Sequence, residues 1–265
     1  RQITNLYDSA LFTRVRNCPA TGNQTLTFDA PGRLVSVTQS GNASFTWTAS
    51  YDALGRRLQT THTPGGGSAV TVTSIYDPEA EFLEVGTKTN GVQQWKLHGP
   101  DISGTIGGWN GVGGLAGVVG PGGEVQGAIC DHFGNAVAST STNGVVSWNL
   151  TKVGAYGPLP NSRAHTVESG ASLIEAGSWR TRRIDPTGYV WMGARNYDPQ
   201  SGRFLEPDPL GHISSWTLVD FADGDPVNGF DPDGRFGKGV SEGLGGRFSA
   251  ISPNSWAYGT GQMLG

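Results

Sequence analysis

The sequence predicts an all-β protein built from short antiparallel strands that are joined by tight turns. Glycine accounts for 42 of the 265 residues and charged residues for only 15%, so turn formers are abundant and good helix formers are scarce. The glycines follow no three-residue period, which excludes a collagen-like chain. Between the turns, apolar and polar residues alternate, as in the segments 34–39 and 69–74, and this period of two is typical of half-buried strands.

The alternation also predicts which side chains are buried. In the first segment, Val35 and Val37 are expected on one buried face and Ser36 on the opposite face. In the second segment, Val70 and Val72 are expected to be buried in the same way.

An internal repeat recurs along the chain. Each copy has an aromatic residue, an Asp, a short turn that usually contains Gly, and then a basic and an apolar residue. The Asp side chain can accept hydrogen bonds from the backbone just beyond it and so close the turn. A single hairpin cannot bury its own face, so we expect the hairpins to stack into one continuous sheet. The copies are marked by Asp8, Asp29, Asp52, Asp77, the degenerate Asp131, Asp185 and Asp198.

The glycine-rich stretch from Gly99 to Gly123 interrupts this pattern. It is compatible with a flexible loop or with hairpins packed through glycine, and we favour the loop.

The copies resemble the YD repeats of Rhs proteins, and residues 28–34 and 51–58 carry the resemblance most clearly. The family fold is a long β-sheet that spirals into a hollow shell, as in bacterial Rhs proteins, ABC-toxin C subunits and animal teneurins. The resemblance implies that residues 1–178 form a segment of such a shell. The aromatic-Asp pairs are then turn residues and not catalytic groups.

From residue 179 to residue 235 the sequence is similar to the Rhs repeat-associated core, most closely between Gly193 and Gly211. In this family the core acts as a self-cleaving aspartic protease that cuts just after an Asp-Pro-x-Gly-Leu motif.

The resemblance implies a catalytic dyad of Asp208 and Asp231 that is supported by Arg195, with cleavage between Arg235 and Phe236. Two neighbouring carboxyl groups share one proton, so one can activate water while the other donates a proton. We expect Arg195 to hold one carboxylate by a bidentate contact. Such a single-turnover autoprotease is one possibility; because the family usually has Leu where this chain has Arg235, an inactive core is the alternative.

We therefore expect a C-terminal shell fragment of an Rhs-type polymorphic toxin of bacterial competition, secreted or held at the cell surface. It would encapsulate a C-terminal effector and release it by cleavage, with residues 236–265 as the start or remnant of that effector. Its partners would be its own upstream shell, its own C-terminal segment and a secretion-apparatus or toxin-complex subunit. The chain opens in mid-pattern without Met or a signal peptide, which we interpret as a fragment or a processed product.

The alternative function is a non-catalytic YD-repeat adhesion or carbohydrate-binding shell. It would use tryptophan rings as a sugar-binding face, although we expect these rings to be packed in the shell. The tryptophans concerned are Trp47, Trp95, Trp109, Trp148, Trp179 and Trp191.

Other classes of partner and ligand are not expected. The formal charge of −4 and the lack of a Lys/Arg cluster argue against nucleic-acid binding, and no apolar run reaches the length of a membrane span. The histidines and cysteines show no metal-ligand spacing, so we expect neither a metal nor a cofactor. Cys18 and Cys130 are expected to be independent thiols, with a disulfide as the alternative in an exported protein.

Overall fold

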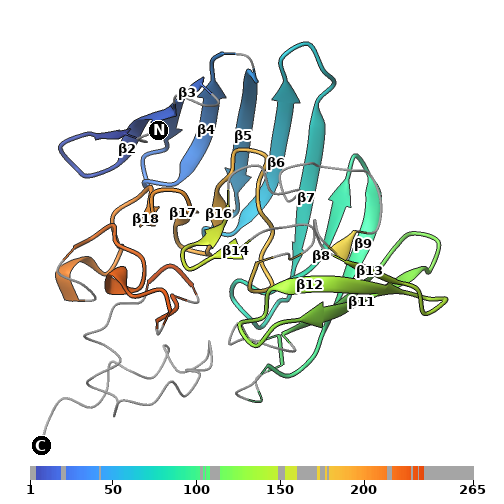
Figure 1. Cartoon of the computed structure of the whole chain (residues 1–265). Coiled ribbons are helices and arrows are strands. Elements are labelled where there is room, and N and C mark those ends of the chain that lie inside the picture. The colour runs from blue at the N-terminus through green and yellow to red at the C-terminus, as the bar shows by residue number, and fades with distance from the viewer. Residues whose placement is uncertain are drawn as a thin grey trace, which may run out of the picture.

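A computed structural model of the chain describes residues 4–18, 22–41, 43–101, 104, 106–107, 114–148, 153–159, 172–173, 177, 179–213, 217–227, 229–231 and 233–235. The predicted all-β fold is confirmed: the described residues form a 13-stranded sheet in which each strand pairs with its neighbours in the sequence, always antiparallel (Figure 1). The strands are β1 (Thr4–Tyr7), β2 (Thr13–Cys18), β3 (Gly22–Phe28), β4 (Leu34–Gln39), β5 (Phe45–Tyr51), β6 (Arg57–Pro64), β7 (Val70–Tyr76), β8 (Glu84–Thr89), β9 (Val92–His98), β10 (Leu115–Val119), β11 (Val125–Cys130), β12 (Ala136–Ser141) and β13 (Val146–Trp148).

The repeated Asp residues close the hairpins, as the sequence predicts. At Asp52, the backbone N–H donates to the carbonyl of Arg56 and the carbonyl accepts from Gly55, while Oδ1 accepts from the backbone of Leu54 and Arg56. Oδ2 accepts from Nε of Arg56 at 2.7 Å. Gly55 adopts a φ of 82°, which a residue with a Cβ rarely adopts. The carboxylate therefore holds both the turn and the arginine that follows it.

Each arginine also reaches the next copy of the repeat. The guanidinium of Arg33 lies 4.8 Å from the ring centre of Tyr51, and its Nη1 donates to the carbonyl of Asp52 at 3.3 Å. Arg56 lies 5.2 Å from the ring of Tyr76 in the same way. Successive hairpins are thus joined by side chains as well as by the sheet, which is how a stack of individually unstable hairpins gains cohesion.

A β-bulge follows several of these turns and changes the predicted burial. In the β3–β4 pair, Thr27 faces Ser36 but Phe28 faces Leu34, so Val35 is an extra residue on β4. Leu34 and Val37 are fully buried, whereas Val35 is only partly buried. The expectation that Val35 and Val37 share the buried face is therefore wrong, because the bulge shifts the alternation by one residue.

The second predicted segment fits better, since Val72 is buried on β7 and Val70 is partly buried. The prediction of a loop between Gly99 and Gly123 is wrong for residues 115–119, because these residues form strand β10. Gly117 on β10 faces Gly127 on β11, and a Cβ on Gly117 would lie 2.5 Å from the carbonyl oxygen of Gln126. Glycine serves here to pack strands closely.

The C-terminal segment, residues 179–235, lies against one face of the sheet (orange in Figure 1). Tyr189 and Leu205 from this segment are buried together with Leu34, Val37 and Trp47 of the sheet. The short elements of this segment are β16 (Val190–Trp191), β17 (Asn196–Asp198), β18 (Arg203–Phe204) and the 3₁₀ turns η2 (Gly211–Ile213) and η3 (Ala222–Gly224). Before this segment, β14 (Val153–Gly154) and β15 (Gly157–Pro158) pair with each other.

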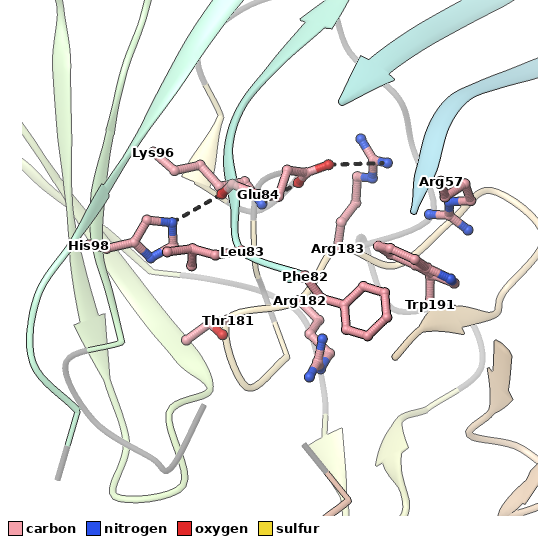
Figure 2. A pocket seen from close by; sticks show the side chains of 10 residues that line it. All are labelled: Arg57, Phe82, Leu83, Glu84, Lys96, His98, Thr181, Arg182, Arg183 and Trp191. Carbon is pink, nitrogen blue, oxygen red and sulfur yellow. Dashed lines mark hydrogen bonds and ion pairs between the residues drawn. The ribbon is translucent and has the colours of Figure 1, made fainter. Parts of the chain in front are cut away.

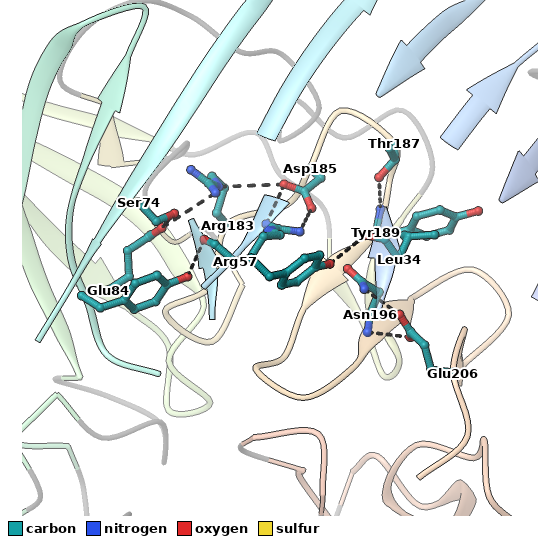
Figure 3. Close-up of polar contacts among 12 residues, drawn as sticks. Leu34, Arg57, Ser74, Glu84, Arg183, Asp185, Thr187, Tyr189, Asn196 and Glu206 are labelled. Atoms are coloured by element: carbon teal, nitrogen blue, oxygen red, sulfur yellow. Dashed lines mark hydrogen bonds and ion pairs between the residues drawn. The ribbon is translucent and has the colours of Figure 1, made fainter. Parts of the chain in front are cut away.

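Buried ion pairs also join the sheet to the C-terminal segment. Arg16 on β2 pairs with Asp198 at 2.8 Å, and Arg57 on β6 pairs with Asp185 at 2.6 Å (Figure 3). Asp198 still forms the β17–β18 hairpin turn that the sequence predicts. Cys130 is a free thiol whose pKa is raised by burial, and the side chain of Cys18 lies outside the described residues. In the part of the chain that the structure describes, no helix has the length and apolar character needed to cross a membrane.

Candidate active site

Arg195, Asp208 and Asp231 meet at one buried point. Nη2 of Arg195 lies 2.9 Å from Oδ2 of Asp208 and 3.0 Å from Oδ2 of Asp231. The exposed fractions of the three side chains are only 2%, 1% and 0%. The structure therefore brings together the three residues that the family resemblance implies, although 36 residues separate Arg195 from Asp231.

Arg195 is fixed by contacts along the whole guanidinium. Its plane lies over the ring of Phe204, with Cζ 3.6 Å from the ring centre. Nε donates to the carbonyl of Gly234 at 2.5 Å, and Nη1 donates to the carbonyl of Leu218 at 3.0 Å. The expected bidentate grip on a single carboxylate is wrong, because one nitrogen serves both carboxylates and the others bind the backbone.

Asp208 is positioned by a tight turn of its own. Its carbonyl accepts from the backbone N–H of Gly211 and its N–H donates to the carbonyl of Leu218. Oδ1 accepts from the backbone of Leu210 at 2.8 Å, which leaves Oδ2 directed at Arg195. The Asp-Pro turn thus aims one carboxylate oxygen into the site.

Asp231 receives more backbone donors. Its Oδ1 accepts from the N–H groups of Gly234 at 2.8 Å, Arg235 at 3.1 Å and Asp233 at 3.3 Å. Three backbone N–H donors on one oxygen fix the orientation of this carboxyl group. The turn from Asp231 to Arg235 is therefore organised around this side chain.

Backbone contacts hold that turn against Arg195. The N–H of Ala194 donates to the carbonyl of Asp233 at 2.8 Å. Gly234 has a φ of 75°, and a Cβ there would lie 3.0 Å from the backbone nitrogen of Arg195. Only glycine accommodates both the backbone conformation and this close approach.

The sequence analysis does not identify Glu206, which is buried beside Asn196. Its carboxylate accepts from the backbone N–H of Asn196 at 2.8 Å and from the side-chain amide of Asn196 at 2.7 Å (Figure 3). Burial raises the pKa of Glu206 to about 7, against the opposing effect of these hydrogen bonds. Its one signal in the sequence is an acidic residue that stands between Leu205 and Pro207.

Arg182 adds positive charge near the dyad. Burial lowers the pKa of Arg182 to about 10, with Asp231 and Asp233 opposing the decrease, so Arg182 is still a cation at neutral pH. Burial also raises the pKa of Asp233. The acidic residues of the site therefore lie in a field that includes two buried arginines, Arg182 and Arg195.

A small cavity lies between the sheet and the C-terminal segment (Figure 2). Its volume is about 40 Å³, which is room for water and not for a peptide. Burial alone would raise the pKa of Glu84, but Lys96 and Arg183 beside it lower the pKa to about 2. The residues that line the cavity are Arg57, Phe82, Leu83, Glu84, Lys96, His98, Thr181, Arg182, Arg183 and Trp191.

At the predicted cleavage position, the structure describes Arg235, and Phe236 lies outside the described residues. The guanidinium of Arg235 binds Glu81 with distances of 2.8 and 3.1 Å and lies 4.9 Å from the ring centre of Phe82. The sequence did not point to Glu81 or Phe82, because their role depends on contacts across more than 150 residues.

No protein-family model matches the chain. Solved structures do resemble it. A crystal structure of TcdB2-TccC3-Cdc42 is 18% identical, with a TM-score of 0.59 over 86% of this chain and 11% of that chain. A crystal structure of TcdB2-TccC3 is 20% identical, with a TM-score of 0.59 and the same coverage.

A Tc holotoxin pore from Photorhabdus luminescens, with an aspartate-to-alanine mutation in TccC3, is 17% identical and has a TM-score of 0.54 over 88% of this chain and 11% of that chain. The chain thus spans about a tenth of the length of the chains that it resembles. At the level of the fold, the expected similarity to Rhs/YD-repeat shell proteins is confirmed: the described residues have the fold of one section of the TcdB2-TccC3 complexes.

Proposed function

We propose that this chain is part of an Rhs-type toxin shell and that its C-terminal segment cuts the chain once, between Arg235 and Phe236. The observation that carries the proposal is the contact of both Asp208 and Asp231 with the same nitrogen of Arg195 in a buried site. Burying two carboxylates together costs free energy, so such an arrangement needs a reason beyond stability.

The two carboxyl groups have different surroundings, which suggests different roles. Asp231, with three backbone donors on Oδ1, is assigned as the base that takes a proton from the attacking water. Asp208 is assigned as the acid that gives a proton to the carbonyl oxygen of Arg235. As the tetrahedral intermediate collapses, Asp231 gives the proton taken from water to the nitrogen of Phe236, the C–N bond breaks, and Asp208 takes its proton back from the former carbonyl oxygen.

The substrate is part of the same chain, which removes the need for a separate binding step. Asp231 precedes Arg235 by four residues, and the backbone N–H of Arg235 already binds its carboxylate at 3.1 Å. Oriented intramolecular reactions reach effective molarities on the order of 10⁵ M. A site that acts once can therefore be slow and still complete its task.

On this proposal, residues 1–178 form a section of the shell and residues 179–235 form the self-cleaving core. Residues 236–265 are either the start or the remnant of an effector that the shell encloses. Export of the protein, and assembly with a toxin-complex subunit, belong to the same proposal. The support for them is the similarity in fold to the TcdB2-TccC3 complexes and to the Tc holotoxin.

Intact-mass spectrometry of the purified 265-residue chain tests the cleavage. The wild type should separate into residues 1–235 and 236–265. Asp208→Asn and Asp231→Asn should each keep the circular dichroism spectrum of a β protein and remain uncut, because Asn preserves the shape but cannot exchange the proton. Cleavage of both Asn variants into the same two fragments, or a wild type that stays intact, would overturn the proposal.

An intact wild type would favour the adhesion or carbohydrate-binding shell instead. Trp95 and Trp148 are 47% and 72% exposed, whereas Trp47 and Trp179 are buried in the packing. The two exposed rings are the candidates for stacking on sugars. Quenching of their fluorescence by oligosaccharides, lost in Trp148→Ala, would support this second function.

A further inference from the structure

The hairpin turn that starts at Asp77 is longer than the other turns of the repeat. At Asp29 and Asp52, the backbone N–H donates to the carbonyl of the residue four positions later. At Asp77 it donates to the carbonyl of Leu83, six positions later. The turn therefore contains two additional residues, and Leu83 stands where the copies at Asp29 and Asp52 have the arginine that binds the turn aspartate.

The longer turn brings Glu81 and Phe82 to the C-terminal segment. The Glu81 carboxylate binds Nη1 of Arg235 at 3.1 Å and Nη2 at 2.8 Å, which is the paired geometry that a guanidinium offers a carboxylate. The guanidinium of Arg235 also lies 4.9 Å from the ring centre of Phe82. The Arg235 side chain therefore contacts a carboxylate and an aromatic ring at the same time.

Phe82 is a rigid platform. It is 8% exposed and packs edge-on against Trp191, with ring centres 5.6 Å apart. Its ring also covers Gly193, where a Cβ would lie 2.8 Å from Phe82. Gly193 lies two residues before Arg195, so the platform is tied to the segment that carries the dyad's arginine.

The backbone of Arg235 is held at the same time by the dyad, because its N–H donates to Oδ1 of Asp231 at 3.1 Å. We propose that Glu81 and Phe82 form the subsite that recognises the arginine side chain on the N-terminal side of the cut, and so fix which peptide bond is presented to the dyad. This inference rests on the proposed self-cleavage. Glu81 and Phe82 are positioning residues, since neither contacts the dyad carboxylates.

The experiment is a double-mutant cycle on the full chain, with the rate of release of residues 236–265 followed by intact mass. Glu81→Gln keeps the shape of the side chain and removes its charge, and should slow release roughly three- to fivefold, the range that corresponds to about 0.6–1 kcal/mol for an exposed pair. In the Arg235→Leu background, the apolar side chain rests on Phe82 alone, so Glu81→Gln should have no further effect. Glu79→Gln, in the same turn, is the matched control and should cleave at the wild-type rate.

The outcomes separate this inference from the proposed function. If Asp208→Asn stops release but Glu81→Gln is as fast as wild type, or if Glu81→Gln is equally harmful with Arg235 and with Leu at that position, the subsite is wrong and the dyad stands. If Asp208→Asn leaves release unchanged, the proposed function itself fails. Thermal unfolding is the internal control, because an ion pair this exposed (26% and 45%) should hardly affect the melting temperature.

Discussion

Arg57 and Asp185 form a buried two-pronged ion pair across 128 residues of sequence. Nη1 and Nη2 of Arg57 donate to the two carboxylate oxygens at 2.6 and 3.1 Å, and the guanidinium lies between Trp47 and Trp191 at 5.6 and 5.3 Å from the ring centres. Arg57 belongs to the sheet and Asp185 to the C-terminal segment. The pair therefore fixes the layer that carries the dyad to the layer that supports it.

Removing one partner of this pair should destabilise the protein strongly. Asp185→Ala leaves a buried guanidinium without its counter-charge, and we expect a loss of about 3–5 kcal/mol in the free energy of unfolding. Urea denaturation measures it. The exposed pair of Arg203 and Asp220, with 49% and 26% exposed side chains, gives the control: Arg203→Met should cost less than about 1 kcal/mol. Equal losses in the two variants would contradict the role given to Arg57.

Glu206 should make the fold less stable as the pH rises. The fold raises its pKa from 4.5 to about 7, so the protonated form is favoured in the folded state. Its contribution is complete below about pH 4.5 and is lost as the pH rises to about 7, a change on the order of 3 kcal/mol. Glu206→Gln, which cannot ionise, should melt at a higher temperature than the wild type at pH 8 and show a smaller decline between pH 5 and pH 8. A wild-type melting temperature that rises over this range in step with the variant would contradict the assignment.

Glu84 should make the fold less stable as the pH falls, which is the opposite of the effect of Glu206. Its pKa is lowered from 4.5 to about 2, so its ionised form is favoured by the fold, and its contribution is present above about pH 4.5 and lost as the pH falls to about 2. Glu84→Gln should therefore be less stable than the wild type at pH 6, with the difference shrinking toward pH 2. Chemical denaturation at several pH values measures this. A difference that stays constant with pH would show that packing and not charge is responsible.

Gly193 should not tolerate a side chain. Its φ is 104°, and an added Cβ would lie 2.8 Å from the ring of Phe82 and 3.0 Å from the carbonyl oxygen of Asp233. Gly193→Ala should destabilise the fold by about 1–3 kcal/mol. It should also slow self-cleavage, because Phe82 contacts Arg235 and the backbone of Asp233 binds Asp231. Gly211→Ala is the control: φ is 64° there, but nothing lies within 4 Å of the added Cβ, so only the backbone cost applies. A Gly193→Ala variant no less stable than Gly211→Ala would contradict this reading.

Arg195→Ala should slow cleavage while leaving more residual activity than either Asn variant. The arginine orients the two carboxylates through Nη2, but the proton transfers are assigned to Asp208 and Asp231. A time course of fragment release measures the three rates. Cleavage slower in Arg195→Ala than in Asp231→Asn would assign the central role to the arginine.

The hairpins could be predicted because their information is local. An Asp that closes a turn needs only the next four or five residues, and the contacts of Asp52 are all of this kind. The bulge at Val35 could not be predicted in this way. A Val-Ser-Val segment has the same alternating pattern whether or not the strand contains an extra residue, so the pattern does not reveal the bulge.

The same distinction between local and long-range information applies to the residues of the site. The resemblance to a known core led to Arg195, Asp208 and Asp231, which the structure places together. Glu206 was missed because its pKa depends on burial under the sheet. Glu81 was missed because 154 residues separate it from Arg235, and one sequence has no periodic signal for such a contact.

The arginine–aromatic contacts that join successive hairpins are found in only one part of the sheet, so the strands should not all unfold with equal cooperativity. Arg14, Arg33 and Arg56 each lie over the aromatic ring of the following copy, at Phe28, Tyr51 and Tyr76. After Asp77 the place of the arginine is taken by Leu83, so this series stops there. In nearest-neighbour terms, strands β1 to β8 should open as one unit, whereas β9 to β13 should exchange their amide hydrogens earlier under mild denaturant. The same two-residue insertion that gives Arg235 its contacts would then also set the boundary between two foldons.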